Sequence, residues 1–246
     1  MDANDADSYL VYDEHTAKEI NQTYRTQNKT AAAVGIGSAR LEKVYSQQRK
    51  NDKTRLAKRR RVMYVLGLMY GNANRNSWTD IQTFQLQQNI VRTFKKFPDI
   101  DFIVKGLAIS DLDYNPLPEF IRDLNLTNCI YLTSGKFVKM LGRADIFLFD
   151  FYSTAMAEAL MTNKTIILYY DKKRPLPLGM DSLAKRIHLV ENIDELSLVL
   201  EKIVKNGDDF PNNNEYQKNY LIPRFGSGGA AKAAVDIIFE KIENGD

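Results

Sequence analysis

A pair of hydroxyl residues at the start of a predicted helix is the part of this sequence best suited to chemistry. The run Asp145–Phe149 predicts a short strand, and Ser153 and Thr154 follow it where a helix is expected to begin. Free main-chain N–H groups favour an anion at such a position, and open α/β sheets bind ligands beyond the carboxyl ends of their strands. Glu158 lies four residues after Thr154, on the same helix face and about 6 Å along the axis. A phosphate on the first turn would therefore leave its attached sugar near this carboxylate.

Two glycines, a lysine and a tyrosine are further candidates for the same site. Gly67 and Gly71 follow a predicted strand at 62–66, and a residue without a side chain lets the main chain approach a diphosphate closely. Lys105 ends the next predicted strand and could direct a positive charge toward a phosphate. Tyr152 could stack on a nucleotide base or pack beneath its own loop, and the sequence does not separate these two roles.

Each candidate also has a purely structural interpretation. Ser153 and Thr154 could simply cap a helix, although Glu158 stands later than the acid of a capping box. Glu158 could be an exposed helix acid, and Lys105 could be a surface lysine at a strand end. Asp150 could cap or orient its loop without touching a ligand, and the glycines could form ordinary turns.

From residue 61 onward, strand signals alternate with helix signals. The expected strands are short apolar runs: 62–66, 101–105, 129–132, 145–149 and 165–170. Capping residues, among them a capping box at Ser77-Trp-Thr-Asp80, and amphipathic stripes predict helices at 77–97, 117–124, 136–143, from 153 onward, at 196–207 and at 230–242. The first stripe consists of Ile81, Phe84, Ile90, Val91, Phe94 and Phe97. This alternation implies right-handed crossovers. Residues 61–246 are thus expected to form one Rossmann-like α/β domain with a doubly wound, mainly parallel sheet of at least five strands.

The first 60 residues differ from the rest of the chain. They are polar, and they offer too little apolar surface to predict an independent core. We expect residues 1–60 to be an N-terminal extension, a linker, or the remnant of a missing N-terminal domain.

The positive charge of the chain is concentrated in the segment Arg49–Arg61. It contains eight Lys or Arg residues and one acid, for a local charge of +7, and since the whole chain carries +3 the remainder carries −4. A solvated linker or helix is the first interpretation of such a run. Contact with an anionic membrane surface or an acidic partner comes second. Nucleic acid is not expected, because aromatic residues do not interleave with the basic ones.

Composition excludes several classes of protein. The charged share of 26% and the hydrophobic share of 44% are those of a soluble globular chain. The longest apolar run, Val62–Tyr70, is too short to span a bilayer, and the first residues do not resemble a secretory signal. The single Cys129 cannot form an internal disulfide, and with only His15 and His188 beside it no metal site is expected. We therefore expect a protein of the reducing cytoplasm, with His188 at a sheet edge rather than in catalysis.

The order of the motifs resembles that of a known family. The chain carries in turn Gly35-x-x-Ser-Ala-Arg-Leu-Glu-Lys43, Asn115-Pro-Leu-Pro-Glu119, Asp150-Phe-Tyr-Ser-Thr-x-x-x-Glu-Ala-Leu160 and Lys164-Thr-Ile-Ile-Leu-Tyr169. Over roughly residues 34–245, this order resembles the C-terminal half of GT-B glycosyltransferases. The most similar group is the bacterial surface-polysaccharide and CDP-glycerol glycerophosphotransferase-like one.

The resemblance implies a site for a nucleotide-activated donor. Ser153 and Thr154 would match the positions that contact phosphate, and Glu158 the acid that bonds the nucleotide ribose. Lys105 is followed by Gly-Leu-Ala where related glycerophosphotransferases tend to have Lys-Pro-His-Pro, so the chemistry of that histidine is not expected here. A GT-B enzyme needs a first domain with the acceptor site, and only about 60 residues precede the sheet. No catalytic residue is assigned, and an N-terminal acceptor domain or partner subunit is expected.

Two classes of function follow from these observations. The leading one is the donor-binding domain of a glycosyltransferase that builds a surface polysaccharide or related polymer, with a nucleotide-sugar 2-epimerase-like domain as the nearest enzyme alternative. The other is a non-catalytic nucleotide-binding or adaptor module of a two-subunit transferase, with Arg49–Arg61 as a contact. We expect no cofactor beyond a nucleotide-sugar or CDP-polyol substrate, and a location in the cytoplasm or at the inner face of the membrane.

Overall fold

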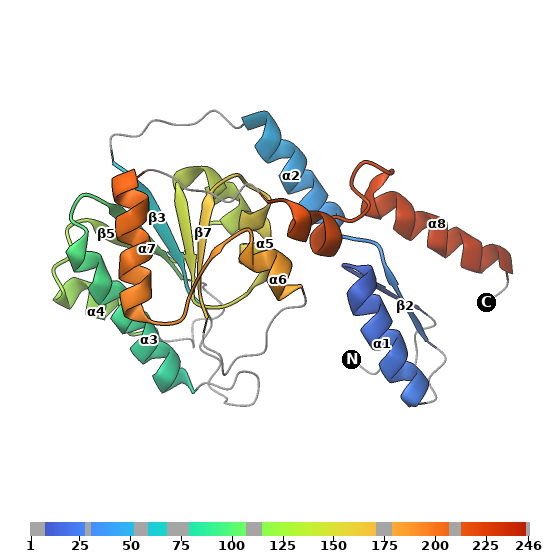
Figure 1. Cartoon of the computed structure of the whole chain (residues 1–246), viewed down its shortest axis with the longest axis horizontal. Helices are drawn as coiled ribbons and strands as arrows, with labels where there is room; N and C mark the ends of the chain where they lie inside the picture. The colour runs from blue at the N-terminus through green and yellow to red at the C-terminus, as the bar shows by residue number, and fades with distance from the viewer. Residues whose placement is uncertain are drawn as a thin grey trace. The chain divides into compact units, whose positions relative to one another are not determined.

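The computed structural model describes residues 8–27, 31–51, 59–67, 79–106, 115–170, 179–206 and 213–244, and Figure 1 shows its helices and strands. The chain divides into two compact units. Unit 1 consists of residues 1–52, 177–185 and 212–246, and unit 2 of residues 53–176 and 186–211. The C-terminal segment thus groups with the N-terminal one, a division that differs from the boundary we expected at residue 61.

Unit 2 is built on one fully parallel sheet of six strands in the order β5-β4-β3-β6-β7-β8. The strands are β3 (Arg61–Val65), β4 (Asp101–Lys105), β5 (Cys129–Leu132), β6 (Ile146–Phe149), β7 (Thr165–Tyr169) and β8 (His188–Val190). Their sequences are almost continuously apolar because both faces of a parallel sheet are covered. The sheet confirms the predicted Rossmann-like, mainly parallel fold and adds one strand, β8, to the expected minimum of five.

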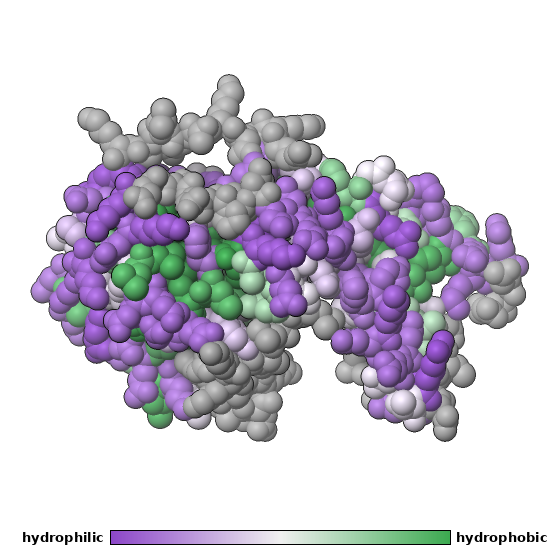
Figure 2. All heavy atoms as spheres, viewed as in Figure 1, coloured by the Kyte–Doolittle hydropathy of each residue, from purple (hydrophilic) through white to green (hydrophobic). Residues whose placement is uncertain are grey.

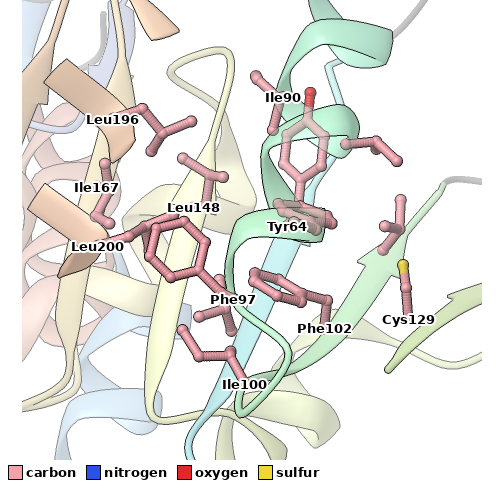
Figure 3. Close-up of a cluster of buried hydrophobic side chains, with 14 of the residues drawn as sticks. Tyr64, Ile90, Phe97, Ile100, Phe102, Cys129, Leu148, Ile167, Leu196 and Leu200 are labelled. Atoms are coloured by element: carbon pink, nitrogen blue, oxygen red, sulfur yellow. The ribbon is translucent and has the colours of Figure 1, made fainter. Parts of the chain in front are cut away.

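Three helices cover one face of this sheet: α3 (Asp80–Thr93), α4 (Leu117–Asp123) and α7 (Ile193–Asn206). Leu86 and Ile90 of α3 and Leu200 of α7 join one buried cluster with side chains of every strand of the sheet. Figure 3 shows Tyr64 and Phe102 of that cluster beside the helical side chains. This packing fixes α3 directly above the end of β3.

The opposite face is covered by the 3-10 helix Phe137–Arg143 and by α5 (Thr154–Leu160), which contact each other. Phe137 places its ring 5.5 Å from that of Phe147 and 6.2 Å from that of Phe149, measured between centroids. Met156 and Leu160 of α5 are fully buried. These contacts hold the start of α5 close to the carboxyl end of β6.

Unit 1 combines segments from both ends of the chain. Its strands β1 (Ser8–Val11) and β2 (Ala32–Gly35) pair in parallel across the helix α1 (Glu14–Thr26). The helices α2 (Ala39–Asn51), α6 (Met180–Ala184) and α8 (Gly229–Asn244) and a π-helical turn at Gln217–Leu221 complete its described part. Glu42 of α2 accepts a hydrogen bond from the main-chain N–H of Ala230 at 3.0 Å. The core that residues 1–60 could not supply alone is therefore shared with C-terminal residues.

Most of the predicted elements are confirmed, with small differences. The helix α3 begins with a capping box of Thr79 and Gln82, two residues after the one predicted at Ser77 and Asp80. Ile81 is 70% exposed and does not belong to the buried stripe. The segment predicted as a helix at 136–143 is a 3-10 helix. His188 lies in the edge strand β8, as predicted. Gly71 and most of the basic run Arg49–Arg61 lie outside the described residues.

Candidate functional site

The strand order of unit 2 creates a switch point between β3 and β6. From β3 the chain adds β4 and β5 toward one edge of the sheet, and from β6 it adds β7 and β8 toward the other edge, although β3 and β6 are neighbours. Val65 and Phe149, the last residues of these two strands, lie side by side in register. In open α/β sheets, ligands bind beyond the carboxyl ends of the strands where the winding direction reverses. The loops after Val65 and after Phe149 therefore define the candidate site.

Four residues at this point form a buried hydrogen-bonded group, which we call the Asp150 cluster: Tyr64, Gly67, Gln87 and Asp150. The Asp150 carboxylate accepts hydrogen bonds from Tyr64 Oη at 2.7 Å, from Gln87 Nε2 at 3.2 Å and from the main-chain N–H of Gly67. Gln87 Nε2 also donates to the carbonyl of Gly67 at 3.0 Å. Three donors compensate the burial of a carboxylate that is only 1% exposed.

Gly67 is required by the close approach of the Asp150 loop. A Cβ atom on Gly67 would lie 2.8 Å from Asp150 Oδ1 and 3.3 Å from the Cβ atom of Phe151, too close for an ordinary contact. Its main-chain N–H donates to Asp150. The glycine therefore joins the two loops, and its predicted role beside a diphosphate stays a prediction.

The predicted hydroxyl pair lies at the start of α5. Ser153 is the N-cap residue, in extended conformation, and its Oγ accepts from the main-chain N–H of Met156 at 3.4 Å. Thr154 is the first helical residue and is exposed. The capping interpretation is thus correct for Ser153, while Thr154 leaves a hydroxyl at the surface beside the switch point. A hydroxyl and main-chain N–H groups at such a position can donate hydrogen bonds to an anion.

Glu158 is buried, at 3% exposure, and lies in α5 among the buried residues Met156–Leu160. The interpretation of this residue as an exposed helix acid is therefore wrong. A carboxylate is retained in a buried position only where polar partners compensate its lost hydration. Glu158 is therefore the first acid along the helix after the hydroxyl pair, within a packed environment.

Lys105 is also buried, at 5% exposure, so its interpretation as a surface lysine is wrong. Its Nζ donates to the carbonyl of Thr133 at 2.9 Å and to the carbonyl of Gly106, and so joins the carboxyl ends of β4 and β5. Burial lowers the pKa of this ammonium group below its ordinary value. The lysine is at the predicted edge of the sheet, but these two bonds direct its charge toward main-chain carbonyls.

Tyr152 is half-buried in the loop between Asp150 and the N-cap Ser153. The structure thus brings Tyr152, Ser153 and Thr154 together at the end of β6. Gly67, just after β3, is connected to this group by its hydrogen bond with Asp150. Lys105 lies at the end of β4, the strand next to β3.

Sequence reasoning did not find Tyr64 and Gln87. Tyr64 is hidden within an apolar strand, where a tyrosine is unremarkable. Gln87 does leave a signal, because it stands three residues after Phe84 and three before Ile90, on the buried face of α3. A fully buried glutamine in an apolar helical stripe needs hydrogen-bond partners, and this requirement could have directed attention to it.

No group of three or more His, Cys, Asp or Glu side chains in the described part of the chain could hold a metal ion. Within the same ranges, no helix has both the length and the apolar composition that a membrane span requires.

No model of a known protein family matches the sequence, and no curated protein matches it. Solved structures do match. The structure of MnaA from S. aureus with UDP aligns with a TM-score of 0.64 and 12% identity, over 97% of this chain and 61% of that one. The sucrose-phosphate synthase of Thermosynechococcus elongatus aligns with a TM-score of 0.59 and 10% identity, over 99% and 60%. The UDP-GlcNAc 2-epimerase of Neisseria meningitidis, bound to UDP-GlcNAc, gives 0.55 and 13%, over 91% and 59%.

The likeness concerns the fold. These structures share the GT-B-like arrangement of parallel α/β sheets, which agrees with the predicted resemblance to that architecture. The chain spans about three-fifths of the length of each of the three, so two-fifths of each structure has no counterpart here.

Proposed function

We propose that unit 2 binds a nucleotide-activated sugar or polyol and serves as the donor domain of a GT-B-type transferase. The diphosphate of the donor would lie at the switch point between β3 and β6, against the start of α5. Ser153 and Thr154 would contact the phosphates, and Glu158 would bond the ribose. Tyr152 would lie at the edge of the base, and no metal would be needed.

One observation carries this proposal: the sheet reverses its winding direction at the point where the Asp150 cluster joins the two loops. A site at this position, with a helix start beside it, suits a phosphate-bearing ligand more than an apolar one. Two of the structurally similar proteins support the choice of ligand, since one was solved with UDP and another with UDP-GlcNAc.

Calorimetric titration of the purified chain with UDP, CDP and GDP tests the proposal. We expect binding of at least one of them, and Glu158→Gln should weaken it about tenfold, a loss of about 1.4 kcal/mol. Glu201→Gln, which removes the same charge from an exposed position of α7, is the matched control and should leave binding unchanged.

The ribose assignment has its own test with the 2′-deoxy form of the same nucleotide. The wild type should prefer the ribonucleotide, and Glu158→Gln should abolish that preference. Equal preference in both proteins would exclude the contact between Glu158 and the ribose.

The biological setting proposed for this activity is the synthesis of a surface polysaccharide or related polymer at the cytoplasmic side of the membrane. The motif order resembling the CDP-glycerol glycerophosphotransferase-like group supports it. A 2-epimerase-like activity is the nearest alternative. Incubation with UDP-GlcNAc, followed by NMR of the sugar C2 proton, distinguishes the two, since only an epimerase exchanges that proton with solvent.

A second candidate function is an interaction module that assembles with another α/β domain. Four apolar side chains of α8 are between 48% and 68% exposed: Val235, Ile238, Phe239 and Ile242. Their spacing of three, one and three residues places them on one helix face. Figure 2 shows hydrophobic residues along this helix. In the described part of unit 1, moreover, the parallel sheet has only two strands, and a sheet this small is seldom stable alone.

The first partner to test is a second copy, because this chain itself carries an α/β domain. We expect sedimentation velocity at micromolar concentration to show a wild-type dimer and a monomeric Ile238→Glu variant. Glu240→Lys, on the polar side of the same helix, should leave the dimer intact. A monomeric wild type would exclude self-association through α8.

A further inference from the structure

We propose that Asp150 is a positioning residue: it holds Gly67, after β3, and the helix α3 against the loop after β6, so that Gly67 and the start of α5 present one preformed site for a diphosphate. This inference rests on the proposed nucleotide binding and adds the residue that organises that site. Asp150 acts through the groups it binds and does not itself touch the ligand.

The two carboxylate oxygens have separate partners. Oδ1 accepts from the main-chain N–H of Gly67, the last described residue before the connection to α3. Oδ2 accepts from Tyr64 Oη and from Gln87 Nε2. Because Tyr64 lies on β3 and Gln87 on α3, one carboxylate holds the elements on either side of the connection.

Gly67 is fixed at both of its main-chain polar groups. Its N–H donates to Asp150, and its carbonyl accepts from Gln87 Nε2 at 3.0 Å. The orientation of the Gln87 amide follows from the carboxylate, since a flipped amide would direct Oε1 against Asp150 Oδ2. Gln87 Oε1 is buried and has no hydrogen-bond partner among the residues that the structure describes. The amide thus keeps its position at the cost of an unsatisfied acceptor.

The cluster is also connected to the hydroxyl pair. Asp150 stands three residues before Ser153, the N-cap of α5, so a fixed Asp150 limits where the N-cap can lie. Buried polar networks in which the members bond one another define a single arrangement more strictly than apolar contacts do. The cluster therefore sets the spacing between Gly67 and the start of α5, the two sides of the proposed diphosphate site.

The experiment compares UDP with uridine, which lacks the diphosphate. We measure both affinities for the wild type and for Asp150→Asn, Gln87→Leu and Tyr64→Phe, with the fold of each checked by circular dichroism. Asp150→Asn and Gln87→Leu should weaken UDP binding about tenfold and uridine binding less than about twofold. Tyr64→Phe leaves both loop contacts of the carboxylate in place and should weaken UDP binding less than about threefold.

A structural control separates positioning from a general loss of stability. Ile203→Val trims the core of unit 2 on α7, away from the cluster residues in sequence, and should lower the melting temperature with both affinities unchanged. Equal weakening of UDP and uridine in the Asp150 and Gln87 variants would overturn the positioning role, and so would unchanged UDP binding in both variants. A wild type that binds neither compound would instead overturn the proposed nucleotide binding itself, and the positioning role with it.

Discussion

Asp150 and Arg186 are two of the four charged side chains that are buried in the described part of unit 2, and they differ in the partners that they bind. Asp150, at the carboxyl edge of the sheet, bonds groups from β3, α3 and the residue after β3. Arg186 donates to the carbonyls of Thr162 at 2.7 Å and Lys164 at 3.4 Å, both in the connection that enters β7 at its amino end. The arginine stabilises one connection within the fold, whereas the aspartate joins separate elements where a ligand is expected. Both side chains are buried, so the number of separate elements that a side chain bonds, more than its burial, distinguishes a site residue from a structural one.

The largest effect is expected when Arg186 is replaced. Arg186→Met leaves the buried carbonyl of Thr162 and the half-buried carbonyl of Lys164 without this donor, and we expect it to lower the free energy of unfolding by about 3 kcal/mol. Urea denaturation followed by circular dichroism measures this loss. Nucleotide affinity of the folded variant should stay within about twofold of the wild type.

Lys185→Met is the control for this substitution. It removes a neighbouring basic residue whose exposed ion pair with Glu215 spans 3.5 Å, and it should change stability by less than about 0.5 kcal/mol. A similar loss in both variants would show that net charge, and not the buried bonds of Arg186, causes the effect.

Lys105→Met has an intermediate expected effect. The substitution keeps the length of the side chain but removes the bonds to the carbonyls of Gly106 and Thr133, so we expect a loss of about 1 kcal/mol in unfolding free energy. UDP affinity should weaken less than about threefold, because the ammonium group is directed at the main chain. Lys95→Met, at an exposed position, is the control.

An opposite result for Lys105 would change the comparison. If UDP affinity fell about tenfold while stability stayed constant, Lys105 would contact the phosphates directly, as the sequence first suggested. Lys105 would then be a residue of the nucleotide site, as Asp150 is proposed to be, and not a purely structural residue like Arg186.

Cys129 gives the smallest effect at neutral pH and shows what burial does without such bonds. Burial raises the pKa of its thiol from 9.0 to about 12, so the native thiol stays neutral between these values while an unfolded one ionises. The unfolded chain therefore holds fewer protons above pH 9, and stability should fall as the pH rises from 9 toward 12. Cys129→Ser should flatten this part of the curve of unfolding free energy against pH. Unchanged curves in both proteins would contradict the burial of the thiol.

The fold was accessible from the sequence because its signals are local. The strand Cys129–Leu132 and the helix ending near Asn206 follow from short apolar runs and a clear amphipathic stripe. The grouping of α8 with α2 was not accessible, since it depends on contacts such as that of Ala230 with Glu42, far apart in the chain. Ile81 was placed in the core by its spacing alone, and the structure leaves its side chain 70% exposed.

The candidate site was accessible in part for the same reason. The hydroxyl pair and Glu158 follow a strand and begin a helix, a local pattern. The Asp150 cluster joins Asp150, at the end of β6, to residues of β3 and α3 that stand 63 to 86 positions away in the sequence. No spacing in the sequence encodes this group, because it depends on the placement of β3 beside β6.

The most direct test of the central claim is an NMR titration of the isotopically labelled chain with UDP. If the nucleotide binds at the switch point, the amide signals of Gly67, Tyr152, Ser153 and Thr154 should shift, and those of Thr162 and Lys164 near Arg186 should not. Shifts confined to the Arg186 region, or the absence of any shift at millimolar UDP, would contradict the account.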